Sequence, residues 1–387
     1  MTSHLQVTKL LDVIVDKLDI PKSYYEKAAN RHRSLGEWLC RSGSRLAAFQ
    51  PNVSPQGSFR YGTVIQPLNS SCEYDLDNVT TLSISKTAMT QKQIKQLYGA
   101  EVAAYAKANG IEEPLEERSR CWRLIYSDEA AFHLDTLPCI PEEGQVIDQI
   151  ASLGVPSILA ALAIAITDKR HPRYEVVTQD LLSSNPRGFA MWFEEQTRPR
   201  ALERMRKLVE SGFYRSLESV PPYEWKTPLQ RSIQLLKRHR DVMFKDNPNL
   251  GPISMIITNI AARAYGGETD IGSALTNIVE RMPLFVRPER PRVPNPADPA
   301  EDYADKWSSD LRLEPNFWLW HEQAKSDIAR LPGILASNRL CVEIQTMFEV
   351  SLGGDDLTPP AVRSTQTARS APIVSIMSAP RPWGHEI

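Results

Sequence analysis

The chain has 387 residues, of which 42% are hydrophobic and 24% are charged, and its formal net charge is −2. This length allows either two domains or one large domain with a sizeable core. Because the net charge is near zero, the protein has no overall positive potential that would attract duplex DNA or an anionic membrane. A local basic cleft is still compatible with this charge. We therefore expect no membrane partner and no requirement for duplex DNA.

The cysteines and the absence of long apolar runs bear on the compartment. The number of cysteines is odd and no CxxC motif occurs, which is typical of reduced structural thiols rather than of a disulfide framework or a zinc site. The cysteines are Cys40, Cys72, Cys121, Cys139 and Cys341. No signal peptide and no apolar run of about 18 residues is recognisable, so we expect a cytoplasmic protein.

The first half of the chain mixes helical and strand patterns. Apolar residues recur at intervals of three and four over 5–49, which predicts two helices divided by Pro21. A Gly-Ser turn follows at 57–58, and then a short helix or loop that closes at Pro67. The further elements expected in this half are a strand over 74–82, a helix over 90–109, strands over 121–126 and 131–138 around a turn at 127–130, and a strand over 162–167 that ends at Asp168.

Helical patterns dominate from residue 185 onward. Asn185 is a predicted N-cap followed by Pro186 at the first helical position, and another amphipathic helix is expected over 227–244. The segment 286–299 contains too many prolines for a helix or a central strand and is expected to be a loop. Three regions result: N-terminal helices with a mixed core over 1–215, a helical domain over 216–352, and a tail over 353–387 that is rich in Pro, Ser and Thr.

Two aspartates, Asp75 and Asp77, occupy alternate positions of the predicted strand over 74–82. Alternate residues of a strand share a face, so two like charges lie side by side and can be neutralised by a divalent cation such as magnesium. Asp135 in the later strand "AFHLDTLP" can supply a third carboxylate. The Gly57-Ser58 turn upstream can present N–H groups and a hydroxyl to phosphate. Together these features predict a metal-dependent nucleotidyl transferase that uses nucleoside triphosphates.

The order of a GS turn, a DxD strand and a third aspartate resembles the polymerase-β-like nucleotidyltransferases. Further blocks narrow the resemblance to the bacterial cGAS/DncV-like nucleotidyltransferases, or CD-NTases, over roughly residues 20–350. The blocks are "QGSFRYGTVIQPL", "EYDLD", "RCWRLIY…FHLDTLP", "SSNPRGFAMWF", "LQRSIQLLKRHRD", "PISMIITNIAARAY" and "NPADPAEDYADKW". The resemblance implies an α+β fold in which a polymerase-β-like core with a mixed β-sheet packs against a C-terminal helical domain.

The resemblance also implies an activity, namely synthesis of a cyclic di- or trinucleotide messenger in the anti-phage systems called CBASS. Two Mg²⁺ ions, for which Mn²⁺ can substitute, would be held by the three aspartates, and Asp135 would assist proton removal from the attacking hydroxyl. Substrates would be nucleoside triphosphates that include ATP. The positions that match the nucleotide-binding blocks are Gln56, Gly57, Ser58, Lys237 and Ser254.

Other readings of single residues stay open. His133 shares a face with Asp135, yet a structural role is favoured for this histidine. Arg60 is placed equally well on phosphate or on a helix surface. The run Lys237, Arg238 and Arg240 would, on composition alone, be a solvated helix face, and only the match to the family block favours Lys237 as a ligand of the triphosphate.

Two other functions compete with cyclic nucleotide synthesis. One is a nucleotidyltransferase that modifies a protein or an RNA end, and the other is an inactive nucleotide sensor. The tail over 355–387 holds apolar residues, including Trp383, that suit addition to a sheet edge of another protein. The resemblance implies a companion protein that is HORMA-like or resembles ubiquitin-transferring enzymes; because the sequence ends in Ile387 without a terminal glycine, peptide capture is favoured over conjugation.

Overall fold

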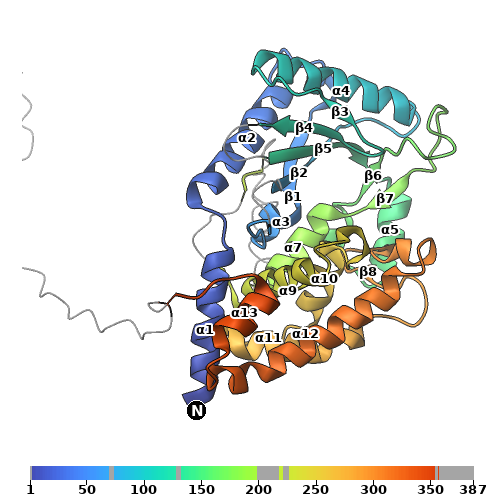
Figure 1. The fold of residues 1–387 in the computed structure, drawn as a ribbon. Coiled ribbons are helices and arrows are strands. Elements are labelled where there is room, and N and C mark those ends of the chain that lie inside the picture. Colours follow the sequence, from blue (N-terminus) through green and yellow to red (C-terminus); the bar gives the residue numbers. More distant parts are fainter. Residues whose placement is uncertain are drawn as a thin grey trace, which may run out of the picture. The chain divides into compact units, whose positions relative to one another are not determined.

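The structure, a computed structural model, describes residues 2–68, 74–127, 132–197, 218–220, 226–353 and 356. In this part of the chain a seven-stranded mixed sheet forms one layer, and its main strands are ordered β1-β2-β5-β4-β3 (Figure 1). The strands are β1 (Asn52–Gln56), β2 (Tyr74–Thr81), β3 (Glu116–Glu117), β4 (Trp122–Tyr126), β5 (Phe132–Pro141), β6 (Ile164–Ile166) and β7 (Leu182–Ser184). Strands β2 and β5 run parallel, whereas β1 and β4 pair antiparallel with β2 and β5.

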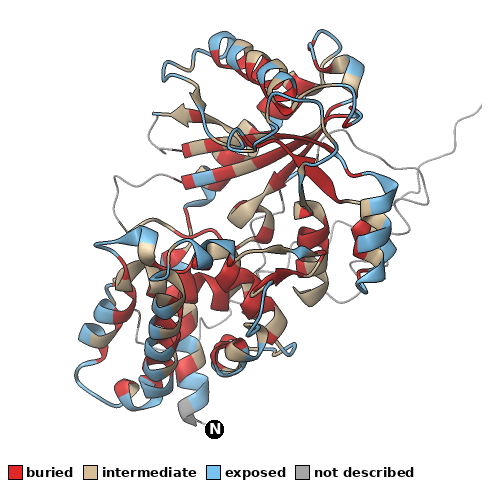
Figure 2. Ribbon diagram, turned by 90° about the vertical axis from the view of Figure 1, so that its right-hand side faces the viewer, coloured by how far each residue is buried: buried red, intermediate tan, exposed pale blue. Residues whose placement is uncertain are grey.

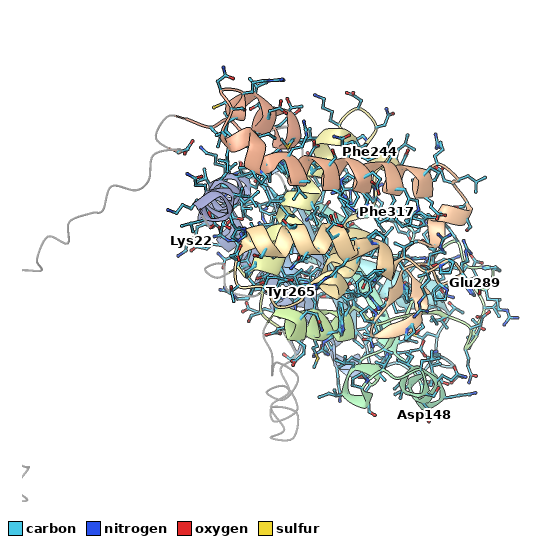
Figure 3. All side chains as sticks on the ribbon, turned by 90° about the horizontal axis from the view of Figure 1, so that it is seen from below. Lys22, Asp148, Phe244, Tyr265, Glu289 and Phe317 are labelled. Carbon is cyan, nitrogen blue, oxygen red and sulfur yellow. The ribbon has the colours of Figure 1, made fainter. Side chains whose placement is uncertain are left out.

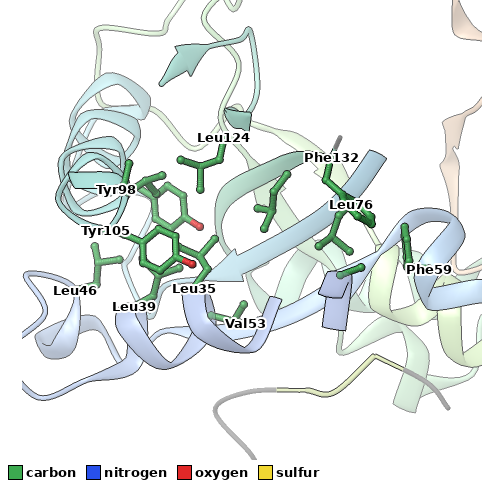
Figure 4. Close-up of a cluster of buried hydrophobic side chains, with 14 of the residues drawn as sticks. Leu35, Leu39, Leu46, Val53, Phe59, Leu76, Tyr98, Tyr105, Leu124 and Phe132 are labelled. Atoms are coloured by element: carbon green, nitrogen blue, oxygen red, sulfur yellow. The ribbon is translucent and has the colours of Figure 1, made fainter. Parts of the chain in front are cut away.

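Helices α2 (Lys22–Cys40) and α4 (Gln91–Ala108) pack against one face of this sheet. Helix α4 begins at Thr90, whose hydroxyl accepts the N–H of Gln93 while the Gln93 side chain accepts the N–H of Thr90. Apolar side chains of both helices and of the facing strands form one buried cluster. Its labelled members in Figure 4 are Leu35, Leu39, Leu46, Val53, Phe59, Leu76, Tyr98, Tyr105, Leu124 and Phe132.

A group of helices forms the lower part of Figure 1. It contains α1 (Thr2–Leu18), α9 (Pro228–Met243), α10 (Ser254–Ala264), α11 (Ile271–Arg281), α12 (Leu313–Leu335) and α13 (Leu340–Phe348). Helix α1 packs against α9, α11 and α12, so the start of the chain contributes to this group. Figure 3 looks onto these helices and labels Phe244 and Phe317, both of which are buried.

Shorter elements connect the sheet with the helices. They are η1 (Ala47–Phe49), α3 (Gly57–Tyr61), α5 (Gly144–Ser152), α6 (Ser157–Ala160), α7 (Pro186–Thr197), η2 (Pro248–Leu250), η3 (Met282–Phe285), η4 (Asp305–Ser308), and the pair β8 (Pro294–Asn295) and β9 (Asp298–Asp302). Central strands are largely buried, while the outer surfaces of the covering helices are exposed (Figure 2).

Local signals explain most element boundaries. The expected cap at Asn185 is confirmed, because its Oδ1 accepts the N–H of Gly188 at 2.9 Å. The expected second helix of 5–49 is too long: it ends at Cys40, where Arg41 turns extended and Ser42-Gly43-Ser44 cannot continue it. The proline-rich segment 286–299 is mostly loop, but its last residues form the short hairpin of β8 and β9.

The α+β fold with a mixed sheet and C-terminal helices agrees with the expectation from the sequence. The expected boundary at 215–216 and nearly all of the tail from 353 lie outside the described residues. No helix within the described residues is both long and apolar enough to cross a membrane.

Candidate active site

Gly57 and Ser58, where a turn was expected, are the first two residues of the short helix α3, which directly follows β1. Gly57 adopts φ +64°, a left-handed conformation that side chains disfavour. A Cβ atom at this position would collide with Oδ2 of Asp77. Glycine is therefore required twice here, by the backbone conformation and by the close approach of the turn to a carboxylate.

The three expected aspartates lie on neighbouring strands. Strands β2 and β5 are paired in parallel, with Asp77 opposite Asp135 and Asp75 opposite His133. Leu76, which lies between the two aspartates of β2, is fully buried in the cluster under α2 and α4. Because side chains alternate along a strand, the carboxylates occupy the other face of the sheet.

Burial and the repulsion between negative charges disfavour the charged state of Asp75 and Asp77. Burial, together with the negative charges of Asp75 and Asp135, raises the pKa of Asp77 to about 7. The pKa of Asp75 is also raised, by partial desolvation in the cavity and by the charge of Asp135, against the opposing effect of Arg123. A bound divalent cation would relieve this repulsion.

Arg123 on β4 is a site residue that the reading of the sequence did not single out. It lies directly opposite Asp135 in the antiparallel pairing of β4 with β5. Its Nε and Nη2 donate to Oδ1 and Oδ2 of Asp135 at 2.7 and 2.8 Å, which makes a two-pronged ion pair. Nη2 of Arg123 also lies 4.0 Å from Oδ1 of Asp75. The only signal in the sequence is an arginine within an otherwise apolar strand.

A cavity of about 330 Å³ opens beside the aspartates of β2. Its walls bring together residues of α3, β2, α9 and α10 that are far apart in the sequence. Expected site residues in these walls are Gly57, Ser58, Asp75, Asp77, Lys237 and Ser254. Two others are not part of the lining: Gln56 ends β1 opposite Asp77, and Asp135 is covered by its pair with Arg123.

Lys237 and Ser254 supply polar groups on the helical side of this cavity. The Nζ of Lys237 donates to the carbonyl of Thr63 at 2.9 Å, and Ser254 begins α10. Burial, followed by the like charge of Arg240, lowers the pKa of Lys237 to about 8. Arg240 lines the same cavity and donates to Oδ1 of Asp241 at 2.6 Å, and Nη2 of Arg240 lies 3.3 Å from Oγ of Ser254.

The structure shows the neighbours of Arg60 and His133, whose roles the sequence did not decide. Arg60 points to carboxylates rather than to the cavity lining, with Glu218 at 3.2 Å and Glu194 at 3.8 Å. His133 Nδ1 lies 3.8 Å from Oδ1 of Asp75 and 3.5 Å from Nη1 of Arg123, so it neighbours the carboxylates.

Of the cysteines, Cys139 is buried, Cys40 and Cys121 are partly buried, Cys341 is exposed, and Cys72 lies outside the described residues.

The donor set can be tested for a divalent cation. Within the described part of the chain no three His, Cys, Asp or Glu side chains are arranged as a ready metal centre. Arg123 donates to both oxygens of Asp135, so the third carboxylate is already engaged in an ion pair. The donors still fit, because carboxylate oxygens are the ligands that magnesium prefers and Asp75 and Asp77 both line the cavity.

The comparisons with known proteins agree with this arrangement. Residues 51–138, which contain the Gly-Ser turn and all three aspartates, match the family model "Cyclic GMP-AMP synthase DncV-like, nucleotidyltransferase domain". A c-di-GMP synthase of Roseivirga ehrenbergii is 26% identical over 81% of this chain and 76% of its own length. The cyclic dinucleotide synthase CdnG of Bradyrhizobium diazoefficiens is 24% identical over 77% of this chain and 70% of its own length.

Solved structures share the fold. The CD-NTase CdnG of Bradyrhizobium diazoefficiens in complex with GTP superimposes with a TM-score of 0.62 and 19% identity, over 88% of this chain and 95% of that one. CdnC of E. coli MS115-1, solved in a complex with HORMA-deltaN, gives a TM-score of 0.59 and 13% identity over 92% of this chain and 100% of that one. These likenesses support the arrangement of the sheet and the C-terminal helices.

Proposed function

The chain belongs to the DncV-like nucleotidyltransferases, the CD-NTases, and on this premise we propose that it joins nucleoside triphosphates into a cyclic dinucleotide with release of pyrophosphate. The observation that carries the proposal is the pairing of Asp77 with Asp135 on adjacent parallel strands, beside a cavity that also contains Lys237. Carboxylates for metal and a cation for phosphate are the two requirements of nucleotidyl transfer.

The relatives named above support a proposal for the size and bases of the product. The resemblance found in the sequence allowed a di- or trinucleotide, with ATP expected among the substrates. Both curated relatives are cyclic dinucleotide synthases, one of them named for c-di-GMP, and CdnG was solved with GTP. We therefore propose a dinucleotide with GTP among the substrates, and ATP as the second nucleotide to test.

Each site residue has a proposed task in the transfer step. Two magnesium ions would lower the pKa of the attacking ribose hydroxyl and neutralise the leaving pyrophosphate. Asp75 and Asp77 would hold both ions, and Asp135 would contact the ion on the side of the attacking hydroxyl and accept the hydroxyl proton. Lys237 would balance charge on the pyrophosphate that leaves.

The remaining expected residues would bind the nucleotide by hydrogen bonds. Ser58 and Ser254 line the same cavity, and their hydroxyls would donate to phosphate oxygens. Gln56 ends β1 next to the turn, where it would fix the entry of Gly57 and so the distance between the turn and Asp77. A second transfer on the bound linear product would close the ring.

We further propose a role in anti-phage signalling together with a companion protein. CdnC of E. coli was solved with a HORMA partner, and the tail of this chain over 355–387 is the segment that we propose a HORMA-like or ubiquitin-transferase-like companion captures. The tail lies outside the described residues, apart from Asp356. Truncation after Gly354 should leave nucleotide chemistry intact and abolish companion binding, and a truncated enzyme with full affinity would contradict the proposal.

Product identification tests the function. The purified chain is incubated with the four nucleoside triphosphates and Mg²⁺, singly and in pairs, and the products are identified by mass spectrometry. A cyclic dinucleotide that contains guanine supports the proposal. Linear or protein-linked nucleotide would instead favour the enzyme that modifies a protein or an RNA end, and no product at all would favour the nucleotide sensor.

A further inference from the structure

Arg123 is a cation at the centre of a site that must bind other cations. The three aspartates carry up to three negative charges, and the guanidinium of Arg123 engages both oxygens of Asp135. It also lies 4.0 Å from an oxygen of Asp75 and 3.5 Å from His133. The Arg123 side chain is only 21% exposed, so water screens its charge weakly.

An ordinary sheet ion pair would explain the distance between Arg123 and Asp135, because the two residues are directly opposite on β4 and β5. The surroundings argue for more than that. The partner of Arg123 is the carboxylate expected to hold the metal on the attacking side, and Arg123 also approaches Asp75 across β5, a side chain that is itself 67% exposed. A metal ion placed next to Asp135 would be repelled by this partly buried guanidinium.

The two other carboxylates are not held by such a two-pronged pair. Among the described residues, Arg123 and His133 approach Asp75 only to 4.0 and 3.8 Å, and no cationic side chain donates a hydrogen bond to Asp77. Lys237 acts on both aspartates through its charge while donating to Thr63. The site is thus uneven: Asp75 and Asp77 face the open cavity, and Asp135 is already neutralised. A cation should therefore bind more tightly beside Asp75 and Asp77 than beside Asp135.

We propose that Arg123 is a positioning residue that makes the two metals bind in sequence. Resting on the proposed function, this assigns the Asp75–Asp77 pair to an ion that binds without nucleotide. The position beside Asp135 fills only when nucleotide phosphates bring negative charge into the cavity. Arg123 orients the Asp135 carboxylate through its two parallel hydrogen bonds and keeps the complete metal pair from forming on an empty enzyme.

Manganese binding to the full chain tests this inference, with the electron paramagnetic resonance of free Mn²⁺ as the readout. Wild type should bind one Mn²⁺ tightly without nucleotide and a second after addition of a non-hydrolysable nucleoside triphosphate. In Arg123→Gln the second ion should bind without nucleotide, with an affinity at least about tenfold higher than in wild type. Arg118→Gln is the matched control, because Arg118 pairs with Glu116 and is half exposed on the neighbouring connection.

A charge-conserving variant separates repulsion from orientation. Arg123→Lys keeps the positive charge but loses the two-pronged geometry. It should bind one ion without nucleotide, as wild type does, while its turnover falls about tenfold or more. If Arg123→Gln does not fold, as judged by thermal unfolding, this variant still tests the inference, since wild-type turnover in Arg123→Lys would overturn it.

The outcomes distinguish this inference from the proposed function. Identical Mn²⁺ stoichiometry and affinity in wild type, Arg123→Gln and Arg118→Gln would overturn sequential binding even if wild type makes the cyclic product. A wild-type chain that binds no Mn²⁺ with nucleotide and makes no product would remove the proposed function, and this inference with it.

Discussion

The two faces of strand β2 serve different purposes within eight residues of chain. Leu76 points into the buried cluster between the sheet and helices α2 and α4, while Asp75 and Asp77 point to the cavity between the sheet and helices α9 and α10. The apolar face gains free energy by leaving water, whereas the acidic face raises the pKa of Asp77 and so costs stability. The contrast indicates that the apolar face of β2 stabilises the fold, whereas the acidic face carries the residues for the proposed reaction.

Removing an acidic side chain should have the largest effect on activity. Asp77→Asn keeps the shape of the side chain but loses the charge that would hold both ions, so turnover should fall at least about a thousandfold. Stability should not fall, because a neutral side chain suits this site. Asp148→Asn on the exposed surface of α5 is the control. Near-wild-type product formation by Asp77→Asn would contradict the assignment of the acidic face.

Removing an apolar side chain should have the opposite profile. Leu76→Ala leaves a cavity in a fully buried cluster and should lower the free energy of unfolding by about 2–5 kcal/mol, measured by denaturant titration. Turnover per folded molecule should stay within about twofold. Leu153→Ala, at a leucine that is 60% exposed, should change neither quantity. If Leu76→Ala lost turnover while its stability stayed unchanged, the division between the faces would be wrong.

The turn beside Asp77 should be sensitive for a geometric reason. Gly57→Ala combines left-handed backbone strain with a collision against the Asp77 carboxylate, so turnover should fall roughly 10–100-fold. Gly110→Ala separates the two causes, since Gly110 also has a left-handed φ, of +65°, but open space around an added Cβ. If turnover fell equally in Gly57→Ala and Gly110→Ala, the close contact between residue 57 and the Asp77 carboxylate would be unimportant for activity.

The smallest expected effect is the pH dependence of nucleotide binding through Lys237. With a lowered pKa of about 8, this lysine loses its proton as the pH rises through 8, and its attraction for triphosphate disappears. Its charged neighbours are Arg240 and Asp241 on α9 and Asp75 and Asp77 on β2. Nucleotide affinity should therefore drop about tenfold between pH 7.5 and 9.5.

Calorimetric titration of wild type and Lys237→Met measures this effect. The methionine variant should bind more weakly at pH 7.5 and show a flat profile. Lys245→Met, at an exposed lysine beyond the end of α9, should follow wild type. A wild-type profile without any loss of affinity above pH 8 would remove Lys237 from the triphosphate site.

Much of this architecture could be predicted because it depends on local patterns. Alternation of polar and apolar residues located β2, and Asn185 and Pro186 marked the start of α7. The spacing of Asp75 and Asp77 placed both on one face, and β5 brings Asp135 beside them through the strand pairing. Helix length was harder to predict, because the break after Cys40 depends on small residues that also occur inside helices.

The remaining features depend on how separate elements meet. The pair of Arg123 with Asp135 arises from the register of β4 against β5, and no spacing in the sequence reveals that register. Likewise, Lys237 reaches the carbonyl of Thr63, more than 170 positions away, only because α9 packs beside the turn region. The side on which α1 packs is also set by tertiary contacts with α9, α11 and α12.

The ratio of pyrophosphate released to cyclic product formed tests the central claim most directly. Cyclic dinucleotide synthesis requires two transfers in one site, each of which releases one pyrophosphate. Purified chain with GTP, with ATP and with both, in Mg²⁺, should give two pyrophosphates per cyclic dinucleotide, and none of either product in Asp77→Asn. One pyrophosphate per linear dinucleotide, or pyrophosphate without any joined nucleotide, would contradict the account.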